Sequence, residues 1–216
     1  MHYLTQFKAY APPKPLPATV VPVSEYLSDV QAGALPSVGF IEAGYMSNRD
    51  EHPSSGTNVQ TGAAYASSLI NALMASPSWK DSVFILTYDE PGGLYDHVPP
   101  QPTVNPDGIA PLDLQPGDVC STGGGANCDF NHTGFRVPLL VVSPFTKNSY
   151  VSHTVADYTA ILKLIETRFN LSPLTKRDAA QMDMTEFFDF QNAPWSTPPT
   201  PPAQSTGGVC NAQVLQ

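Results

Sequence analysis

One continuous run of strand-forming residues at positions 83–88, Val-Phe-Ile-Leu-Thr-Tyr, constrains the fold of this chain most strongly. The run almost lacks the alternation of apolar and polar residues that marks a strand with one face in water. It therefore predicts a strand covered on both faces, as in a parallel sheet. Asp89 and Glu90 follow at once, and a Pro-Gly-Gly sequence at 91–93 then predicts a tight turn.

Further apolar segments surround this strand. Their spacing predicts strands at 38–41 and 137–143 and helices at 62–76 and 155–169. The resulting order is strand, helix, strand, long loop, strand, helix. That order is typical of an α/β fold with a mainly parallel sheet flanked by helices.

Proline divides the chain into regions. The 23 prolines gather at 12–17, 99–116 and 194–202, which predicts loops or extended segments there. The predicted regions are an N-terminal extended or loop segment at 1–34, a folded region at 35–190, a long loop or lid at 98–135 within it, and a proline-rich, disordered tail at 191–216.

Charge and hydropathy exclude some classes of partner. The chain has 10 basic and 19 acidic residues, giving a net charge of −9, and this argues against binding to nucleic acid or to anionic membranes. No apolar run is long enough to predict a transmembrane segment. The first residues do not resemble a signal peptide, and no pattern indicates an oligomeric state.

Two sequence features concern possible modification. Cys120 and Cys128 bracket a glycine-rich loop, which is compatible with a disulfide or with two free thiols, and Cys210 lies in the predicted tail. Asn131 begins an Asn-His-Thr sequon for glycosylation, a pattern that also occurs by chance.

The carboxylates at 89 and 90 are the strongest candidate for chemistry. Ligands of open α/β sheets bind at the carboxyl ends of the strands, and two adjacent carboxylates there are costly to bury unpaired. A divalent cation such as magnesium, calcium, manganese or zinc would remove that cost. The alternative is a solvated acidic turn. Asp96 and His97 add a second carboxylate and an imidazole nearby.

The segment at 87–98, Thr-Tyr-Asp-Glu-Pro-Gly-Gly-Leu-Tyr-Asp-His-Val, resembles the signature of the phosphoesterase family of phospholipases C and acid phosphatases. Pro91 and Tyr158 stand where the family often has other residues, His in the second case. Further matching segments lie at 50–53, 79–82, 134–138, 142–144, 152–154, 157–159 and 164–169.

This resemblance implies an alkaline-phosphatase-like fold and hydrolysis of phosphoric esters, either phospholipids or small phosphomonoesters. It implies that Asp89 and Glu90 bind one divalent metal ion of unspecified identity, and that the protein is extracellular or bound to the cell wall.

The resemblance also implies roles for other side chains, each with a structural alternative. His52 would contact the phosphoryl group or protonate the leaving group, and His97 is a second catalytic candidate. His153 is a weaker candidate that could instead cap or pack a helix. Arg136 could meet phosphate, although pairing with an acidic loop residue is the favoured alternative. Asp96 is expected to orient the region of His97.

The sequence also departs from the family. The Glu-Asn metal-binding motif is absent, and no Ser or Thr lies in a context that matches the nucleophile. The chain therefore resembles the C-terminal half of the family fold, an incomplete domain. An alternative function is that of a catalytically inactive remnant that acts as a binding protein. A sulfatase or phosphomutase of the same superfold is a third, less favoured reading.

Overall fold

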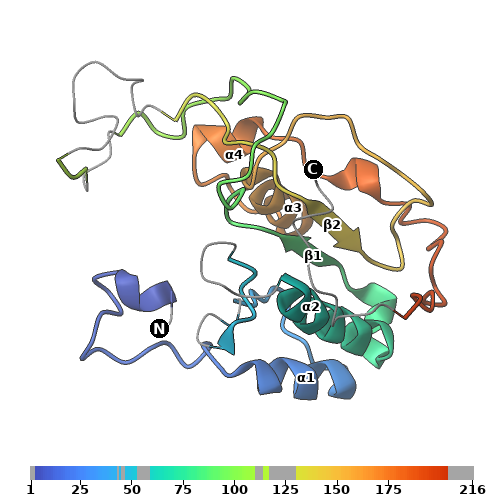
Figure 1. Cartoon of the computed structure of the whole chain (residues 1–216). Coiled ribbons are helices and arrows are strands. Elements are labelled where there is room, and N and C mark those ends of the chain that lie inside the picture. Colours follow the sequence, from blue (N-terminus) through green and yellow to red (C-terminus); the bar gives the residue numbers. More distant parts are fainter. Residues whose placement is uncertain are drawn as a thin grey trace, which may run out of the picture. The chain divides into compact units, whose positions relative to one another are not determined.

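The computed structural model describes residues 3–42, 44, 47–52, 59–109, 114–116 and 130–203. The chain forms two compact units, and each is described by itself. The first comprises Met1–Phe84, Val142–Pro144 and Trp195–Gln216, and the second comprises Ile85–Val141 and Phe145–Pro194. Figure 1 shows the helices and the short strand pair that follow. Within the described ranges, no helix has the length and apolar character needed to cross a membrane.

The first unit is built on helices α1 (Val23–Ala32) and α2 (Val59–Met74) and on the 3-10 helix η4 (Pro77–Asp81). Val30, Leu73 and Trp79 are buried at its centre. The hydroxyl of Tyr26 on α1 donates a hydrogen bond of 3.0 Å to the carbonyl of Leu69 on α2, which joins the two helices.

Helix α1 corrects the prediction of an extended or loop segment at 1–34, which also contains a 3-10 helix, η1 (Tyr3–Gln6). Pro22 precedes the helix in an extended conformation, and Gly33 ends it with a φ of 68°. Glycine reaches this left-handed region without the steric cost that other residues meet. Its backbone amide thereby reaches the carbonyls of the last turn. Pro22 and Gly33 therefore mark the limits of this helix in the sequence.

Helix α2 confirms the helix predicted at 62–76, with its start three residues earlier. Leu69 and Leu73 are buried one turn apart, as the four-residue spacing predicts. The strand predicted at 38–41 does not form in the structure. Phe40 in this segment is 79% exposed. A short apolar run becomes a strand only when it finds a partner strand, and this one finds none among the described residues.

The predicted tail is partly ordered. Trp195 is half-buried against the core of the first unit. Its carbonyl accepts a hydrogen bond of 2.9 Å from the indole Nε1 of Trp79. Its backbone amide donates to the carbonyl of Pro144 at 2.9 Å. Residues 204–216, which include Cys210, lie outside the described part of the chain.

Two strands confirm the sequence prediction in position: β1 (Phe84–Thr87) and β2 (Leu139–Val142). They pair with each other, and the arrows in Figure 1 run in opposite directions. Consistent with this, the hydroxyl of Thr87 at the end of β1 donates to the carbonyl of Pro138, just before β2, at 3.0 Å.

The pairing corrects the expectation of a mainly parallel sheet for the described strands. A parallel pair needs a crossover, usually a helix. The described residues between β1 and β2 contain no helix, so the connection leaves an antiparallel pair possible. Burial on both faces is also incomplete: Leu139 and Leu140 are 41% and 47% exposed.

The helices of the second unit are α3 (Thr159–Phe169), α4 (Lys176–Ala180) and the 3-10 helix η5 (Thr185–Phe187). The predicted helix at 155–169 thus begins four residues late. Asp157 explains the start, because its Oδ1 accepts a hydrogen bond of 2.8 Å from the backbone amide of Thr159, the first residue of α3. Its Oδ2 forms an ion pair with Arg177 on α4 at 2.8 Å, which connects the two helix starts.

A buried carboxyl pair also connects α3 with α4. Glu166 is 6% exposed and Asp178 is 1% exposed. Burial, followed by the neighbouring Asp178 carboxyl, raises the pKa of Glu166. Burial also acts to raise the pKa of Asp178, but hydrogen bonds, first from the Thr175 hydroxyl, outweigh it and lower the pKa to about 2.

The raised pKa of Glu166 predicts a folding stability that falls as pH rises. Because the folded state holds the proton of Glu166 more tightly than the unfolded chain does, the stabilisation is complete below the ordinary pKa of 4.5 and is lost as pH rises through the raised value. Asp178 acts in a separate window below 3.8, where stability falls as pH falls. Urea unfolding between pH 4 and 8 should show a weaker pH dependence in Glu166→Gln. The exposed Glu25→Gln is the matched control and should retain the wild-type slope.

Candidate active site

The turn after β1 presents the two candidate metal ligands. Asp89 and Glu90 are exposed, and the chain reverses immediately after them. Gly92 and Gly93 have φ values of 66° and 74°, and the backbone amide of Leu94 donates to the carbonyl of Pro91 at 3.2 Å. Two successive left-handed residues explain why glycine occupies both positions. The predicted tight turn is therefore confirmed.

The same loop is anchored by a bidentate ion pair between Asp96 and Arg136. The Asp96 carboxylate accepts hydrogen bonds of 2.8 Å from Nε and from one terminal nitrogen of Arg136. It also accepts from the backbone amides of Val98 at 3.1 Å and of Arg136 at 3.2 Å. The guanidinium hydrogen bond of Arg136, first of all, holds the pKa of Asp96 well below its usual range. Arg136 therefore pairs with an acidic loop residue, the favoured alternative to phosphate.

Removing the charge of Asp96 should loosen this loop. In Asp96→Asn the side chain loses one acceptor oxygen and its charge, so the backbone amides of Val98 and Arg136 lose a strong partner. Their hydrogen exchange is expected to accelerate at least about tenfold. Asp107→Asn is the control, since the Asp107 carboxylate accepts a hydrogen bond from the backbone amide of Ile109 in a similar turn. Equal protection in Asp96→Asn and wild type would contradict the anchoring role.

Tyr158 reaches the strand end from the start of α3. Its hydroxyl donates a hydrogen bond of 2.9 Å to the backbone carbonyl of Asp89, across 69 residues of sequence. Burial, then the carboxylates of Asp89 and Glu90, raises the pKa of Tyr158. This residue was not among the predicted site residues. Its departure from the family's His was the available signal, but the sequence does not show that the hydroxyl reaches Asp89.

The three candidate histidines lie in different surroundings. His52 is exposed and belongs to the first unit. The His97 side chain is 81% exposed, and its Nδ1 lies 3.8 Å from Oδ1 of Asp96, so Asp96 stands beside the imidazole that it is expected to orient. His153 is exposed between Ser152 and Thr154. Both of these hydroxyls donate to the Glu186 carboxylate, which fixes the turn around His153.

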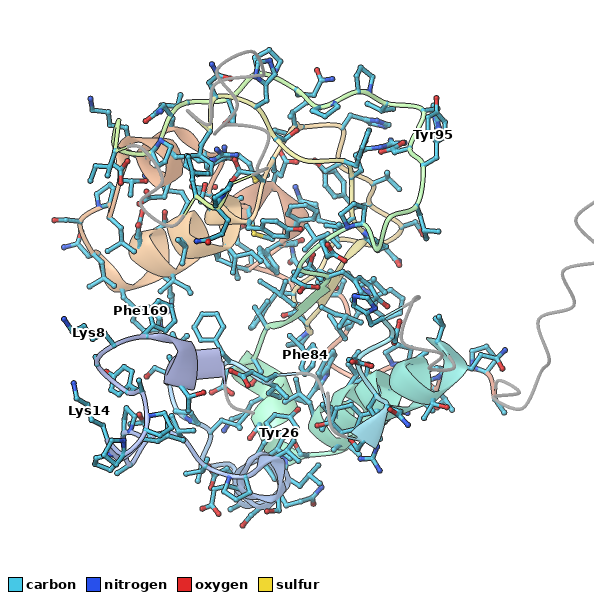
Figure 2. All side chains as sticks on the ribbon, turned by 60° about the vertical axis from the view of Figure 1, so that its left-hand side comes forward. Lys8, Lys14, Tyr26, Phe84, Tyr95 and Phe169 are labelled. Carbon is cyan, nitrogen blue, oxygen red and sulfur yellow. The ribbon has the colours of Figure 1, made fainter. Side chains whose placement is uncertain are left out.

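The exposed loop also carries large side chains. Leu94 and Tyr95 are 67% and 89% exposed. Figure 2 shows Tyr95 extending from the edge of the structure.

The predicted modification sites differ in what the structure shows of them. The sequon residue Asn131 is exposed, so its side chain is accessible for attachment of a glycan. Cys120 and Cys128 lie outside the described residues.

The donor set suits a hard divalent cation only in part. Asp89 and Glu90 offer carboxylate oxygens, the ligands that magnesium, calcium and manganese prefer. Within the described ranges, however, no group of three or more His, Cys, Asp or Glu side chains is placed to hold a metal ion. The described residues therefore offer two candidate ligands but do not complete a metal site.

Comparison with known proteins decides the family. The model of the phosphoesterase family matches residues 3–172. The chain belongs to this family. Phospholipase C B of Mycobacterium tuberculosis is 35% identical over 186 residues, covering 82% of this chain and 33% of the relative. The hemolytic phospholipase C of Pseudomonas aeruginosa is 36% identical over 177 residues, covering 79% and 23%.

A match of similar extent comes from Burkholderia pseudomallei. Its non-hemolytic phospholipase C is 33% identical over 189 residues, covering 80% of this chain and 25% of the relative. This phosphoesterase chain thus spans a third or less of the length of these curated relatives. The mixture of helices with a small sheet is consistent with an α/β class.

Proposed function

We propose that this chain provides the carboxylate part of the active centre of a phosphoric ester hydrolase. The observation that carries the proposal is the pair Asp89 and Glu90, presented at a tight turn directly after β1 within a family signature. The relatives named phospholipase C favour a phospholipid-type substrate, with small phosphomonoesters as the other class. An extracellular or cell-wall location and an alkaline-phosphatase-like fold with further, parallel strands belong to the same proposal.

Asp89 and Glu90 would hold one divalent ion together with ligands beyond the described set. When bound, the ion would polarise the phosphoryl oxygens. His52 would donate a proton to the oxygen of the departing alcohol, and His97 is the second candidate for this proton. The Ser or Thr nucleophile that this chemistry requires is proposed to be missing from this chain. The tight turn contributes by holding both carboxylates at one strand end.

A second candidate function is that of an inactive chain that binds phosphate esters without cleaving them. The incomplete metal ligand set among the described residues favours it. A cation held by two carboxylates binds weakly, because calcium and magnesium normally take six or more ligands.

Release of nitrophenol separates the two functions. The chain is incubated at high concentration with 4-nitrophenyl phosphate or 4-nitrophenylphosphorylcholine, with manganese or with a chelator. Hydrolysis that depends on the metal supports the hydrolase. A folded chain that binds manganese but releases no nitrophenol from either compound supports the inactive alternative. Hydrolysis that is unchanged by the chelator contradicts metal assistance.

A further inference from the structure

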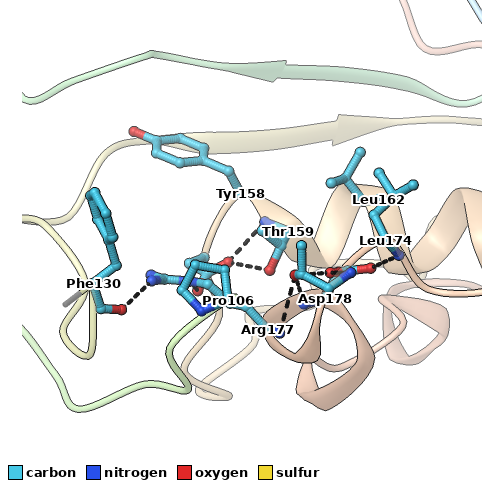
Figure 3. A pocket seen from close by; sticks show the side chains of 10 residues that line it. Pro106, Phe130, Tyr158, Thr159, Leu162, Leu174, Arg177 and Asp178 are labelled. Carbon is cyan, nitrogen blue, oxygen red and sulfur yellow. Dashed lines mark hydrogen bonds and ion pairs between the residues drawn. The ribbon is translucent and has the colours of Figure 1, made fainter. Parts of the chain in front are cut away.

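A cavity in the second unit lies beside the candidate active site. It has a volume of about 320 Å³ and includes Phe130, Tyr158, Leu162 and Leu174 in its lining. Figure 3 shows these side chains around the starts of α3 and α4. This volume is near the lower end of the range for ligand pockets, so the cavity suits part of a ligand rather than a large whole one.

The charged groups that line the cavity already have partners: Asp157 and Arg177 pair with each other, and Asp178 accepts hydrogen bonds from backbone amides. Oδ2 of Asp157 accepts hydrogen bonds from Arg177 Nε at 2.8 Å and from Gln181 Nε2 at 3.1 Å. A terminal nitrogen of Arg177 donates to the carbonyl of Phe130 at 2.6 Å. The two oxygens of Asp178 accept from the backbone amides of Leu174 and Thr175, each at 2.7 Å. A ligand in this cavity therefore meets aromatic and aliphatic surface rather than unpaired charged groups.

Tyr158 links the lining of this cavity to the strand end. Its ring lines the cavity, while its hydroxyl is bonded to the carbonyl of Asp89. One side chain thus connects the apolar walls with the strand end that carries the carboxylates of Asp89 and Glu90. A phosphate ester whose phosphoryl group lies at those carboxylates can extend its alcohol portion over the Tyr158 ring.

We propose that this cavity is the subsite for an apolar alcohol portion of a phosphate ester, with Tyr158 as the positioning residue between subsite and phosphoryl site. The subsite rests on the proposed function for its substrate class. Its apolar walls favour alkyl or aryl esters over esters of small polar alcohols. Each methylene buried there should strengthen binding about fourfold, from the free energy of burying a methylene group.

Leucine methyl NMR of the full chain tests the subsite without requiring catalysis. The probes are hexyl phosphate, methyl phosphate and 1-hexanol. Hexyl phosphate is expected to bind at least about tenfold more tightly than methyl phosphate and to shift the methyl signals of Leu162 and Leu174. 1-Hexanol should shift the same signals, since it reports the cavity alone.

Two variants and a matched control localise the effect. Leu174→Asn should remove the preference for hexyl phosphate, and because Leu174 is 76% exposed the change leaves the fold intact. Phe130→Ser, at a position 49% exposed, should do the same. Leu171→Asn is the control, because Leu171 is 56% exposed nearby in the sequence but does not line the cavity.

The outcomes distinguish the subsite from the proposed function. Equal affinity for hexyl and methyl phosphate, or a preference that survives both Leu174→Asn and Phe130→Ser, overturns the subsite. Binding of 1-hexanol at Leu162 and Leu174 without any hydrolysis of nitrophenyl esters supports the apolar cavity and counts against the hydrolase. Hydrolysis without binding of 1-hexanol supports the hydrolase and overturns the subsite.

Discussion

Replacing Asp89 by Asn should lower metal-dependent hydrolysis of 4-nitrophenylphosphorylcholine at least about 100-fold, because a lost metal ligand removes several kcal/mol of charge stabilisation at the phosphoryl group. Asn has the size of Asp but lacks its negative charge. The exposed side chain makes few contacts that the substitution would disturb, so the fold should persist. Initial rates at saturating manganese, with circular dichroism as a check on folding, measure the effect.

Asp107→Asn is the matched control for this substitution. Asp107 is exposed in the same unit and lies outside the strand end, so its loss should change the rate less than about twofold. If Asp89→Asn kept the full metal-dependent rate of the wild type, Asp89 could not be a metal ligand in the reaction.

Trp79→Ala should destabilise the first unit by about 3–5 kcal/mol, the usual cost of deleting a large buried aromatic side chain. Trp79 is 5% exposed in the core with Val30 and Leu73. Its indole also donates a hydrogen bond to the carbonyl of Trp195, so the variant loses that hydrogen bond together with the packing. Urea unfolding followed by circular dichroism measures the loss.

Phe40→Ala provides the comparison within the same unit. Phe40 is 79% exposed, and its truncation should change stability by no more than about 0.5 kcal/mol. A Trp79→Ala variant as stable as Phe40→Ala would show that the described core is not the one that stabilises the chain. Loss of protection at the amide of Trp195 in Trp79→Ala would additionally confirm that this part of the predicted tail is ordered.

The sequence predicted those elements whose information is local. Helix α2 follows from apolar residues one turn apart, and β1 follows from an unbroken strand-forming run. The strand expected at 38–41 failed because a strand depends on a partner elsewhere. Helix α1 was missed within a proline-rich region, although Pro22 and Gly33 mark its limits. The antiparallel pairing of β1 and β2 depends on a long connection whose path no local pattern specifies.

The candidate site shows the same difference between features set by local sequence and features set by contacts with distant residues. The turn at Gly92 and Gly93 could be predicted because two successive glycines after a proline are typical of a turn with left-handed backbone angles. The pairing of Asp96 with Arg136 could be anticipated as an alternative, since a charged loop residue needs an opposite charge. The contact of Tyr158 with Asp89 could not, because it joins residues 69 positions apart and replaces an expected imidazole by a phenol.

The central claim is that the strand end at Asp89 and Glu90 binds a divalent cation. Substoichiometric manganese should broaden the backbone amide NMR signals of Gly92, Gly93 and Tyr158, because a paramagnetic ion held at the carboxylates lies close to all three. The same titration of the double variant Asp89→Asn, Glu90→Gln should leave these signals sharp. Unbroadened signals in the wild-type chain, or equal broadening in the variant, would contradict the claim.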